Sequence, residues 1–288
     1  MSEATYYFNS YTPAECWGYQ PGEIVDNNLS NFARASVTGD IALVDGNTCA
    51  GTNLGSISKV EIRIYALRTM NVGNSITVRP VFSGTSDGDN HVVTISTSGE
   101  WSSYVDITSD TNAPGTWAWS NIQNLDCDLE STVVTGYVDC AKVEIRVTYT
   151  APTPTLTLST AALTGFTYVQ GSGPSTEQSY NISGTALNLT DVTITPPPVG
   201  AIMPSNWQIS LTSGSGFTTN PITLSSYDGT LTTIYVRLKN ALLAGTYNNQ
   251  AITNAGGGAS TVNVTCSGEV TAAPVTGGTL TINSKYWG

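Results

Sequence analysis

Residues 59–67, KVEIRIYAL, and residues 141–150, AKVEIRVTYT, decide the fold class of this chain of 288 residues. In each stretch Val and Ile alternate one by one with Glu and Arg, a period of two that is typical of a β-strand with one buried face. We therefore expect two strands whose aliphatic side chains face a core. The stretches are similar enough to be neighbouring strands of one sheet or copies in an internal repeat, and two short matches do not establish a repeat.

The same alternation continues outward from these two stretches. In the first half it occurs at residues 75–82, 91–96 and 103–108, with Gly, Asn and Asp turns between them. The second half contains about eight short alternating segments at intervals of roughly 8–14 residues, with no amphipathic helix between them. This spacing predicts Greek-key β-sandwiches rather than a parallel sheet, which needs helical crossovers. A helical signal occurs only at residues 117–125, WAWSNIQNL.

Composition and charge exclude several classes of partner. Charged residues make up 11% of the chain, against roughly 25% in an average soluble protein. The chain is instead rich in Thr and Gly, with 43 and 28 residues. The formal net charge of −11 argues against binding to nucleic acid or to anionic membranes. No stretch reaches the roughly 20 apolar residues of a membrane span, so we expect no membrane insertion. The N-terminus lacks a secretory pattern, so we expect a removed leader or a route without one.

The sequence Ala151-Pro152-Thr153-Pro154 marks a boundary, because prolines at alternate positions favour a short, extended connector. Residues 1–151 hold 17 acidic and 7 basic residues, whereas residues 152–288 hold 4 and 3. We therefore expect four segments, namely an acidic domain at 1–150, a linker at 151–155, a nearly neutral domain at 156–271 and an extended tail at 272–288.

In the second half, YVQGSGPS, WQIS, IYVRLKN and CSGEV follow one another within residues 163–184, 207–217 and 232–270. This order resembles the Ig-like modules of Bacteroidota surface proteins and their phages, over nearly the whole of 155–270. The resemblance implies an Ig-like Greek-key β-sandwich in a spacer, stalk or adhesive role. The Pro-rich stretch at 196–206 departs from the family, and we expect an exposed loop there.

In the first half, the Asp- and Asn-rich segment 23–37, together with residues 100–108, 114–130 and 141–150, resembles jelly-roll domains of the galactose-binding type in phage structural and secreted proteins. The resemblance implies a jelly-roll β-sandwich. In such domains the Asp-rich segment can build a structural Ca²⁺ site, and here Asp26 and Asn28 supply suitable oxygens. The alternative is an Asx-rich turn, which needs no metal. We expect no other cofactor.

No catalytic constellation stands out in the chain. Residues 84–88, GTSDG, match a nucleophile elbow and precede His91, the single histidine, but they lie between two strand patterns, where an exposed hairpin turn is expected. One His and no CxxC pair argue against a zinc site. We therefore expect that the protein is not an enzyme.

The cysteines suggest an oxidising destination. Cys127 and Cys140 flank a segment that can fold back as a hairpin, and Cys16 and Cys49 lie in turn-rich stretches. We expect at least one disulfide, with Cys127–Cys140 as the first candidate and Cys16–Cys49 as the second. The alternative is reduced, buried cysteine, which we expect for Cys266.

Aromatic residues offer a candidate binding surface. Exposed Trp and Tyr rings with nearby Asp and Asn bind sugars or partner proteins. The first domain places such candidates beside its turns, at Trp17, Tyr19, Trp101, Trp117 and Trp119. The alternative for the tryptophans in the later part of this domain is that they pack the ends of the sandwich.

The tail carries one more strand pattern, in which Leu280 and Ile282 alternate ahead of Tyr286 and Trp287. A spare alternating segment pairs with a neighbouring subunit or domain, or adds an edge strand to its own domain. We expect this tail to act in assembly.

Together these patterns predict a non-enzymatic structural and adhesive protein on the surface of a virus particle, such as a capsid decoration, a head-fibre or a tail-associated protein of a bacteriophage. The expected partners are other copies of the chain, other virion or surface proteins, and host-surface glycans. The alternative is a secreted bacterial cell-surface adhesin or an extracellular filament subunit.

Overall fold

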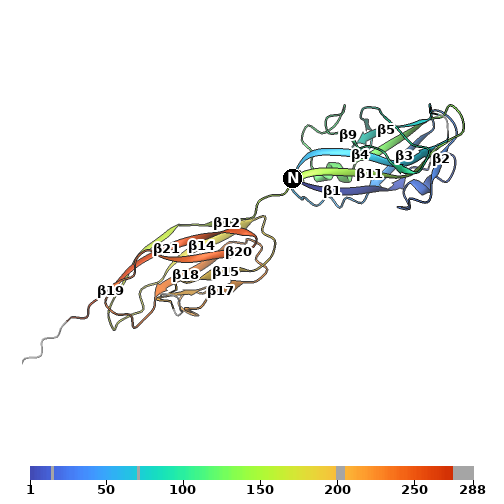
Figure 1. The fold of residues 1–288 in the computed structure, drawn as a ribbon. Helices are drawn as coiled ribbons and strands as arrows, with labels where there is room; N and C mark the ends of the chain where they lie inside the picture. Colours follow the sequence, from blue (N-terminus) through green and yellow to red (C-terminus); the bar gives the residue numbers. More distant parts are fainter. Residues whose placement is uncertain (14–15, 70–71, 199–204, 275–288) are drawn as a thin grey trace, which may run out of the picture. The chain divides into compact units, whose positions relative to one another are not determined.

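The computed structural model describes residues 1–13, 16–69, 72–198 and 205–274, which form an almost wholly β structure (Figure 1). The expectation of an all-β protein is confirmed. The chain divides into two compact units, Met1–Pro152 and Thr153–Gly288, and the division falls inside the Pro-rich stretch 151–155. Among these described residues, no helix is long and apolar enough to cross a membrane.

The first unit contains a single-turn 3-10 helix at Pro21–Ile24, a short helix α1 at Trp119–Gln123, and strands that pair in the order β6-β5-β10-β3-β1-β11-β4-β8. Strand β2 pairs with β11, β7 with β5, and β9 with β4. Helix α1 lies within the stretch for which the sequence predicts a short helix. The strands are β1 (Ser2–Tyr11), β2 (Ala33–Ala35), β3 (Ile41–Asn47), β4 (Ser56–Arg68), β5 (Ser75–Phe82), β6 (Ser86–Asp87), β7 (His91–Val93), β8 (Glu100–Trp101), β9 (Val105–Asp106), β10 (Asp126–Thr132) and β11 (Val138–Thr150).

Strand β1 belongs to two layers of the first unit. Its residues 2–7 pair with β11, whereas Phe8, Ser10 and Tyr11 pair with β3. One layer therefore contains β4 and β11, and the other contains β3, β5 and β10. The aliphatic residues of both layers meet in one core, in which the alternate Val and Ile residues of β4 and β11 are fully buried. The period-two pattern thus correctly predicts which side chains face inward.

Strands β4 and β11 are antiparallel neighbours, so the two similar stretches pair with each other. Glu144 lies opposite Arg63, and Arg146 lies opposite Glu61. Because the Glu-Ile-Arg run is read in opposite directions on the two strands, each Glu faces an Arg across the sheet. This register gives the outer side of the β4–β11 layer its alternating charges.

The second unit forms two sheets, one in the order β12-β14-β18-β16 and one in the order β13-β21-β20-β15-β17, with β19 paired to β21. The pairing of β13 with β21 is parallel, and the chain leaves one sheet at Leu158 and enters the other at Ala162. The strands are β12 (Thr155–Leu158), β13 (Ala162–Val169), β14 (Gln178–Thr185), β15 (Val192–Thr195), β16 (Trp207–Ser210), β17 (Ile222–Leu224), β18 (Thr232–Leu238), β19 (Gly245–Thr246), β20 (Gln250–Gly256) and β21 (Ala259–Thr271).

Trp207 lies at the centre of a separate core in the second unit. Its ring is fully buried, packs edge-on against Phe166 at 4.8 Å between centroids, and donates through Nε1 to Gln250 Oε1 at 2.8 Å. Nearby, the Tyr180 hydroxyl donates to Asn254 Oδ1 at 2.8 Å. The buried polar atoms of this core are thus hydrogen-bonded, as a stable interior requires.

Two expectations for the second half are affected by these observations. Pro196 and Pro197, at the start of the predicted exposed loop, are buried, so the loop is not exposed from its first residue. The tail residues predicted to act in assembly, Leu280, Ile282, Tyr286 and Trp287, lie outside the described residues.

Candidate functional site

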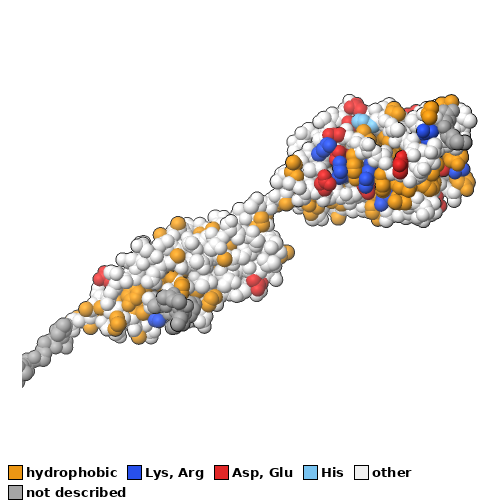
Figure 2. All heavy atoms as spheres, viewed as in Figure 1, with side chains coloured by type: hydrophobic (Ala, Val, Ile, Leu, Met, Phe, Trp, Pro, Cys, Tyr) orange, Lys and Arg blue, Asp and Glu red, His pale blue; other side chains and the backbone are white. Residues whose placement is uncertain are grey.

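The outer side of the β4–β11 layer gathers most of the basic side chains of the first unit. Figure 2 shows these Lys and Arg side chains among acidic and apolar ones over β4 and β11. We call this surface the charged aromatic face, and it consists of Lys59, Glu61, Arg63 and Tyr65 of β4, Lys142, Glu144 and Arg146 of β11, and Trp101 and Tyr104 beside them.

Ion pairs across the two strands bind the charged aromatic face together. Arg63 Nη2 lies 2.6 Å from Glu144 Oε1, and Arg146 Nη2 lies 2.7 Å from Glu61 Oε2. Lys59 Nζ approaches the other oxygen of Glu61 at 2.6 Å. The two carboxylates are only 5% and 10% exposed, whereas the three cationic side chains are 26–43% exposed. Glu61 and Glu144 therefore lie beneath the cations, whereas Asp106, 3.7 Å from Lys59 Nζ at the edge of the face, is 52% exposed.

Aromatic rings hold the two guanidinium groups in place. The Arg63 guanidinium lies 4.1 Å from the centroid of Trp101 and 4.5 Å from that of Tyr104, and the Arg146 guanidinium lies 3.7 Å from Tyr104. Cation–π contacts of this kind stabilise by about 0.5–1 kcal/mol at exposed sites. The Tyr104 hydroxyl donates to Glu144 Oε1 at 2.6 Å. Burial, together with this hydrogen bond, raises the pKa of Tyr104 to about 12.

The aromatic surface continues from Trp101 toward β2. Trp101 and Tyr65 pack edge-on at 5.4 Å between centroids, and Tyr65 stacks on Phe32 at 6.2 Å. The Tyr65 hydroxyl donates to the carbonyl of Gly99 at 2.8 Å, which fixes the ring. A row of rings thus runs from Tyr104 to Phe32.

This row ends at a small polar hollow of about 270 Å³, lined by Tyr19, Gln20, Glu23, Ser30, Asn31, Phe32, Arg34 and Asp139. The Arg34 guanidinium binds Asp139 through Nε and Nη2 at 2.7 and 2.8 Å, and it lies 3.5 Å from the centroid of Tyr137. Tyr19 is 57% exposed, with the Arg34 guanidinium 6.0 Å from its centroid. The hollow combines an open ring, a fixed cation and several hydrogen-bonding groups.

The Asp26 and Asn28 side chains, which the sequence offers for Ca²⁺, instead close a turn. Asp26 Oδ1 accepts from the Asn28 amide at 2.8 Å, Asp26 Oδ2 accepts from Asn31 Nδ2 at 2.8 Å, and Asn28 Oδ1 accepts from the Ser30 amide at 3.0 Å. A hydrogen bond to Asp26 raises the pKa of Glu23. The described residues contain no group of three or more His, Cys, Asp or Glu that could hold a metal. These contacts fit the Asx-rich turn, and the Ca²⁺ site stays a prediction.

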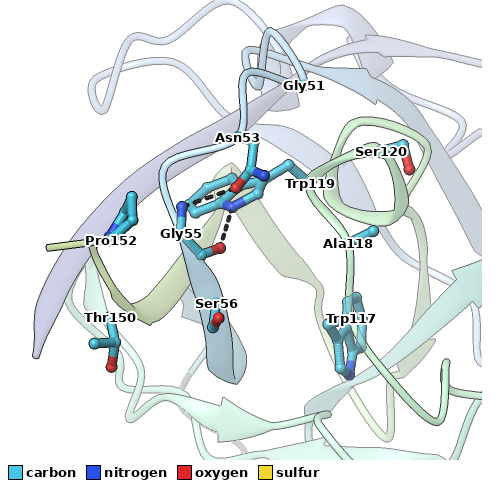
Figure 3. A pocket seen from close by; sticks show the side chains of 10 residues that line it. All are labelled: Gly51, Asn53, Gly55, Ser56, Trp117, Ala118, Trp119, Ser120, Thr150 and Pro152. Carbon is cyan, nitrogen blue, oxygen red and sulfur yellow. Dashed lines mark hydrogen bonds between the residues drawn. The ribbon is translucent and has the colours of Figure 1, made fainter. Parts of the chain in front are cut away.

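A second, larger hollow of about 570 Å³ lies beside α1 (Figure 3), lined by Gly51, Asn53, Gly55, Ser56, Trp117, Ala118, Trp119, Ser120, Thr150 and Pro152. Trp119 Nε1 donates to the Gly55 carbonyl at 2.7 Å, and Trp117 Nε1 donates to the Thr108 carbonyl at 3.0 Å. Both tryptophans are buried, and Trp119 packs edge-on against Tyr149 at 5.2 Å. Trp117 and Trp119 thus pack this end of the unit and also wall a hollow.

Trp17 is a core residue, which corrects its placement among the surface candidates. Its side chain is fully buried, and its Nε1 donates to the carbonyls of Leu129 at 3.1 Å and Asp40 at 3.3 Å. A buried indole needs such a partner for its N–H, so the polar neighbours of Trp17 serve the interior. Of the five predicted binding residues, Trp101 belongs to the row of surface rings, and Tyr19 lines the hollow at its end.

The predicted disulfides are not formed in the structure, where all five cysteines of the chain lie among the described residues and are free. Cys127 lies on β10 and Cys140 on β11, and these strands are separated in the sheet order by β3 and β1. The hairpin expected between Cys127 and Cys140 is therefore wrong. The Cys16 thiol contacts the Pro13 carbonyl at 2.9 Å, and the buried Cys49 thiol contacts the Trp119 carbonyl at 4.0 Å.

The GTSDG stretch forms a hairpin turn, because β6 pairs directly with β5. His91 on β7 contacts Asp110 through Nε2 and Oδ2 at 2.8 Å. These positions match the turn expected from the sequence.

Sequence reasoning missed most of the charged aromatic face and the ring beside it, namely Lys59, Glu61, Arg63, Tyr65, Lys142, Glu144 and Arg146, with Phe32 next to Tyr65. The signal was present in the two KVEIR runs, because antiparallel pairing of such runs places Glu opposite Arg. Choosing that pairing required knowledge that the two strands are neighbours. Phe32 carried no comparable pattern.

No family model matches the chain, and no curated protein matches it. Among solved structures, the chain is similar to the crystal structure of a beta-1,2-glucanase from Parabacteroides distasonis, with a TM-score of 0.26 and 9% identity. The match covers 94% of this chain and 37% of the glucanase chain, so this chain spans little more than a third of that protein. A likeness at this TM-score assigns neither a fold nor a substrate. The similarity to an enzyme nevertheless corrects the expectation that the protein is not an enzyme, and that exclusion is withdrawn.

Proposed function

We propose that the chain is a structural and adhesive protein of a virus particle, a capsid decoration, head-fibre or tail-associated protein, whose first unit binds host-surface glycans on the charged aromatic face. The observation that carries the proposal is the row of surface rings formed by Tyr104, Trp101, Tyr65 and Phe32, which ends at the hollow beside Tyr19.

The chemistry of this row suits a polysaccharide. Aromatic rings offer flat apolar faces to the C–H faces of sugar rings, and polar groups beside them bind the hydroxyl groups. The hollow supplies such groups from Gln20, Ser30 and Asn31, next to the exposed ring of Tyr19. The rings are held by neighbouring contacts, so little conformational entropy is lost when a ligand binds.

The arrangement of strands supports the two finer fold assignments. Two largely antiparallel layers around one core fit a jelly-roll sandwich in the first unit. In the second unit, β12 belongs to one sheet and the next strand, β13, belongs to the other, where it pairs in parallel with β21. This arrangement fits an Ig-like sandwich. Both types are the ones that the sequence resembles in phage structural and surface proteins, and they favour display on a particle, with copies of the chain or other virion proteins as partners.

Binding to immobilised host-surface glycans tests the adhesive part of the proposal. The intact chain is expected to bind a subset of a glycan array, and Trp101→Ala is expected to lower that binding at least about tenfold, because stacked aromatic anchors carry much of the binding energy. Tyr235→Ala is the matched control, since Tyr235 is a half-buried ring on β18 of the second unit. Array binding that is absent, or equal in both variants, contradicts the proposal.

The location is tested separately with antibodies against the chain. Immunogold labelling of purified virus particles is expected if the protein is a virion component. Labelling confined to bacterial cell surfaces would instead favour a secreted adhesin or filament subunit, and would leave the glycan-binding face unchanged.

A further inference from the structure

The basic residues of the first unit are distributed unevenly. Residues 1–151 hold 17 acidic and 7 basic residues. Five of the seven basic residues lie on the outer side of the β4–β11 layer, on or beside the charged aromatic face, namely Arg34, Lys59, Arg63, Lys142 and Arg146. An acidic unit thus concentrates its cations on the same side as its row of aromatic rings.

The carboxylates that pair with the three arginines lie deeper than the guanidinium groups do. Asp139 is 4% exposed beneath Arg34, Glu61 is 5% exposed beneath Arg146, and Glu144 is 10% exposed beneath Arg63. The three arginine side chains are 26–39% exposed. A ligand that approaches the three arginines therefore meets guanidinium groups before their paired carboxylates, while the exposed carboxylate of Asp106 lies at the Lys59 edge, 3.7 Å from Lys59 Nζ.

The three arginines use the same edge of the guanidinium group for their internal partner. Arg34, Arg63 and Arg146 each contact a carboxylate through Nε and Nη2. A guanidinium group has five N–H donors, so each arginine is held by one edge and retains donors for a second acceptor.

We propose that the ligand of this face is an acidic polysaccharide whose sugar rings carry carboxylate groups. This inference rests on the proposed glycan-binding function and adds the chemical class of the glycan. The sugar rings lie against Trp101 and Tyr104, and the carboxylates accept hydrogen bonds from the Nη1 groups of Arg63 and Arg146. These two arginines are diagonal neighbours on adjacent strands, a relation that places two residues roughly 7–8 Å apart.

Charge complementarity favours this ligand over a nucleic acid. The first unit is acidic as a whole, so a polymer with a phosphate at every residue is repelled at distances near the Debye length of about 8–10 Å. A polysaccharide whose acidic sugars alternate with neutral ones, as in hyaluronate, carries fewer charges per residue and is repelled less, so its carboxylates can make short-range contacts with the exposed cations. Arginine also suits a carboxylate, since both groups are planar and form paired hydrogen bonds.

The test compares carboxylated polysaccharides with their neutral esters. Polygalacturonate, alginate, hyaluronate and polysialic acid are each assayed against the intact chain beside the methyl ester of the same polymer. At least one acid polymer is expected to bind about tenfold or more tightly than its ester, because hydrogen bonds to charged groups are lost on esterification. The preference is expected to shrink as NaCl is raised.

A matched pair of arginines supplies the control. Arg79 on the other layer pairs with Asp128 at the same exposures, 26% and 10%, as Arg63 with Glu144. The variant Arg63→Gln with Arg146→Gln is expected to lose the preference for the acid polymer, whereas Arg79→Gln is expected to keep it. Thermal unfolding of both variants checks that the first unit remains folded, and Arg63→Lys with Arg146→Lys provides a second variant that keeps the charge and should retain part of the preference.

The outcomes separate this inference from the function on which it rests. Equal binding of acid and ester, abolished by Trp101→Ala, would overturn the acidic ligand and leave glycan binding in place. If the chain bound neutral glycans on an array but none of the acid polymers, the acidic ligand would likewise be overturned and glycan binding would stand. Absence of binding to any glycan overturns both. Binding of poly-L-glutamate as tight as that of the acid polymers would show that the face recognises acidic peptides and not sugars.

Discussion

Glu144 connects the two kinds of contact on the charged aromatic face, since it accepts from Arg63 and from the Tyr104 hydroxyl. Glu144→Ala leaves Arg63 without its carboxylate and Tyr104 without its acceptor. We expect a fall in the free energy of unfolding of about 2 kcal/mol, the range for hydrogen bonds that involve a charged group. Urea unfolding of the variant measures this change. Glu100→Ala, at an exposed residue on β8, should change it by less than about 0.5 kcal/mol.

The environment of Tyr104 also predicts a response to alkaline pH. Burial raises its pKa from 10.0 to about 12, so the folded form holds the hydroxyl proton at pH values where the unfolded chain has lost it. The corresponding stability is fully present below pH 10 and is lost as the pH rises toward 12. An absorbance titration of phenolate should therefore show one late-titrating tyrosine fewer in Tyr104→Phe than in the parent chain. The free energy of unfolding of this variant should also fall less steeply between pH 10 and 12. A titration identical to that of the parent would contradict the buried hydroxyl.

The cysteines differ in accessibility, which allows a direct measurement. Burial raises the pKa of Cys140 and of Cys266 to about 12, whereas Cys16 is only half-buried. Because thiolates are the reactive species, a thiol reagent at pH 8 is expected to label Cys16 first and the others slowly. Cys16→Ser should remove the fast phase. After unfolding without a reductant, all five thiols should react. If only three thiols or one thiol reacted, the chain would contain one or two disulfides, as the sequence predicted.

At the scale of single elements, β4 and β11 illustrate what a sequence can predict. The alternation of Val and Ile with Glu and Arg is a local property, and it correctly predicts two strands and their buried sides. The charged aromatic face required more, because it depends on which strands are neighbours and in which register. Trp101 adds to it only through the pairing of β8 with β4. Such long-range pairings have no local signature, so the site could be predicted only in part.

The connection between β10 and β11 shows why the predicted hairpin did not form. It does not turn back on β10 but contacts residues of the β4–β5 region. Thr69 Oγ1 donates to the Thr135 carbonyl at 3.0 Å and accepts from the Tyr137 amide at 3.1 Å, and Asn74 Nδ2 donates to the same carbonyl at 2.8 Å. These side-chain bonds substitute for hairpin pairing, and a sequence pattern of Val, Thr and Gly does not reveal them.

Gly136 within this connection provides a test. Its φ is +84°, and a Cβ there would lie 2.3 Å from Thr69 Oγ1. Gly136→Ala is therefore expected to destabilise the first unit by about 1–3 kcal/mol, through backbone strain and displacement of the hydrogen-bonded Thr69. Gly115→Ala is the control, because a Cβ at that residue would have nothing within 4 Å and its φ is not in the left-handed region. Equal denaturation midpoints for the two variants would argue against this packing.

At the scale of the whole molecule, charge and surface chemistry divide between the two units. The first unit carries a net charge of −10, since it has 17 acidic and 7 basic residues, and it also carries the row of aromatic rings. The second unit has only 4 acidic and 3 basic residues, and its strands are rich in Thr. One unit thus has the features of a binding surface, and the other those of a neutral spacer.

Each unit has a core of its own, built around different tryptophans, and this predicts independent unfolding. Trp17 is fully buried in the first core and Trp207 in the second. Trp17→Ala and Trp207→Ala should each cost about 3–5 kcal/mol, the usual loss when a large aromatic side chain leaves a cavity. Calorimetry of the intact chain is expected to show two transitions, with Trp17→Ala lowering the midpoint of one and Trp207→Ala lowering that of the other. Binding to glycans should follow the Trp17-sensitive transition on heating, because the charged aromatic face lies on that unit. If both substitutions shift one common transition, the two cores unfold as a single cooperative body and the separation of binding unit from spacer does not hold.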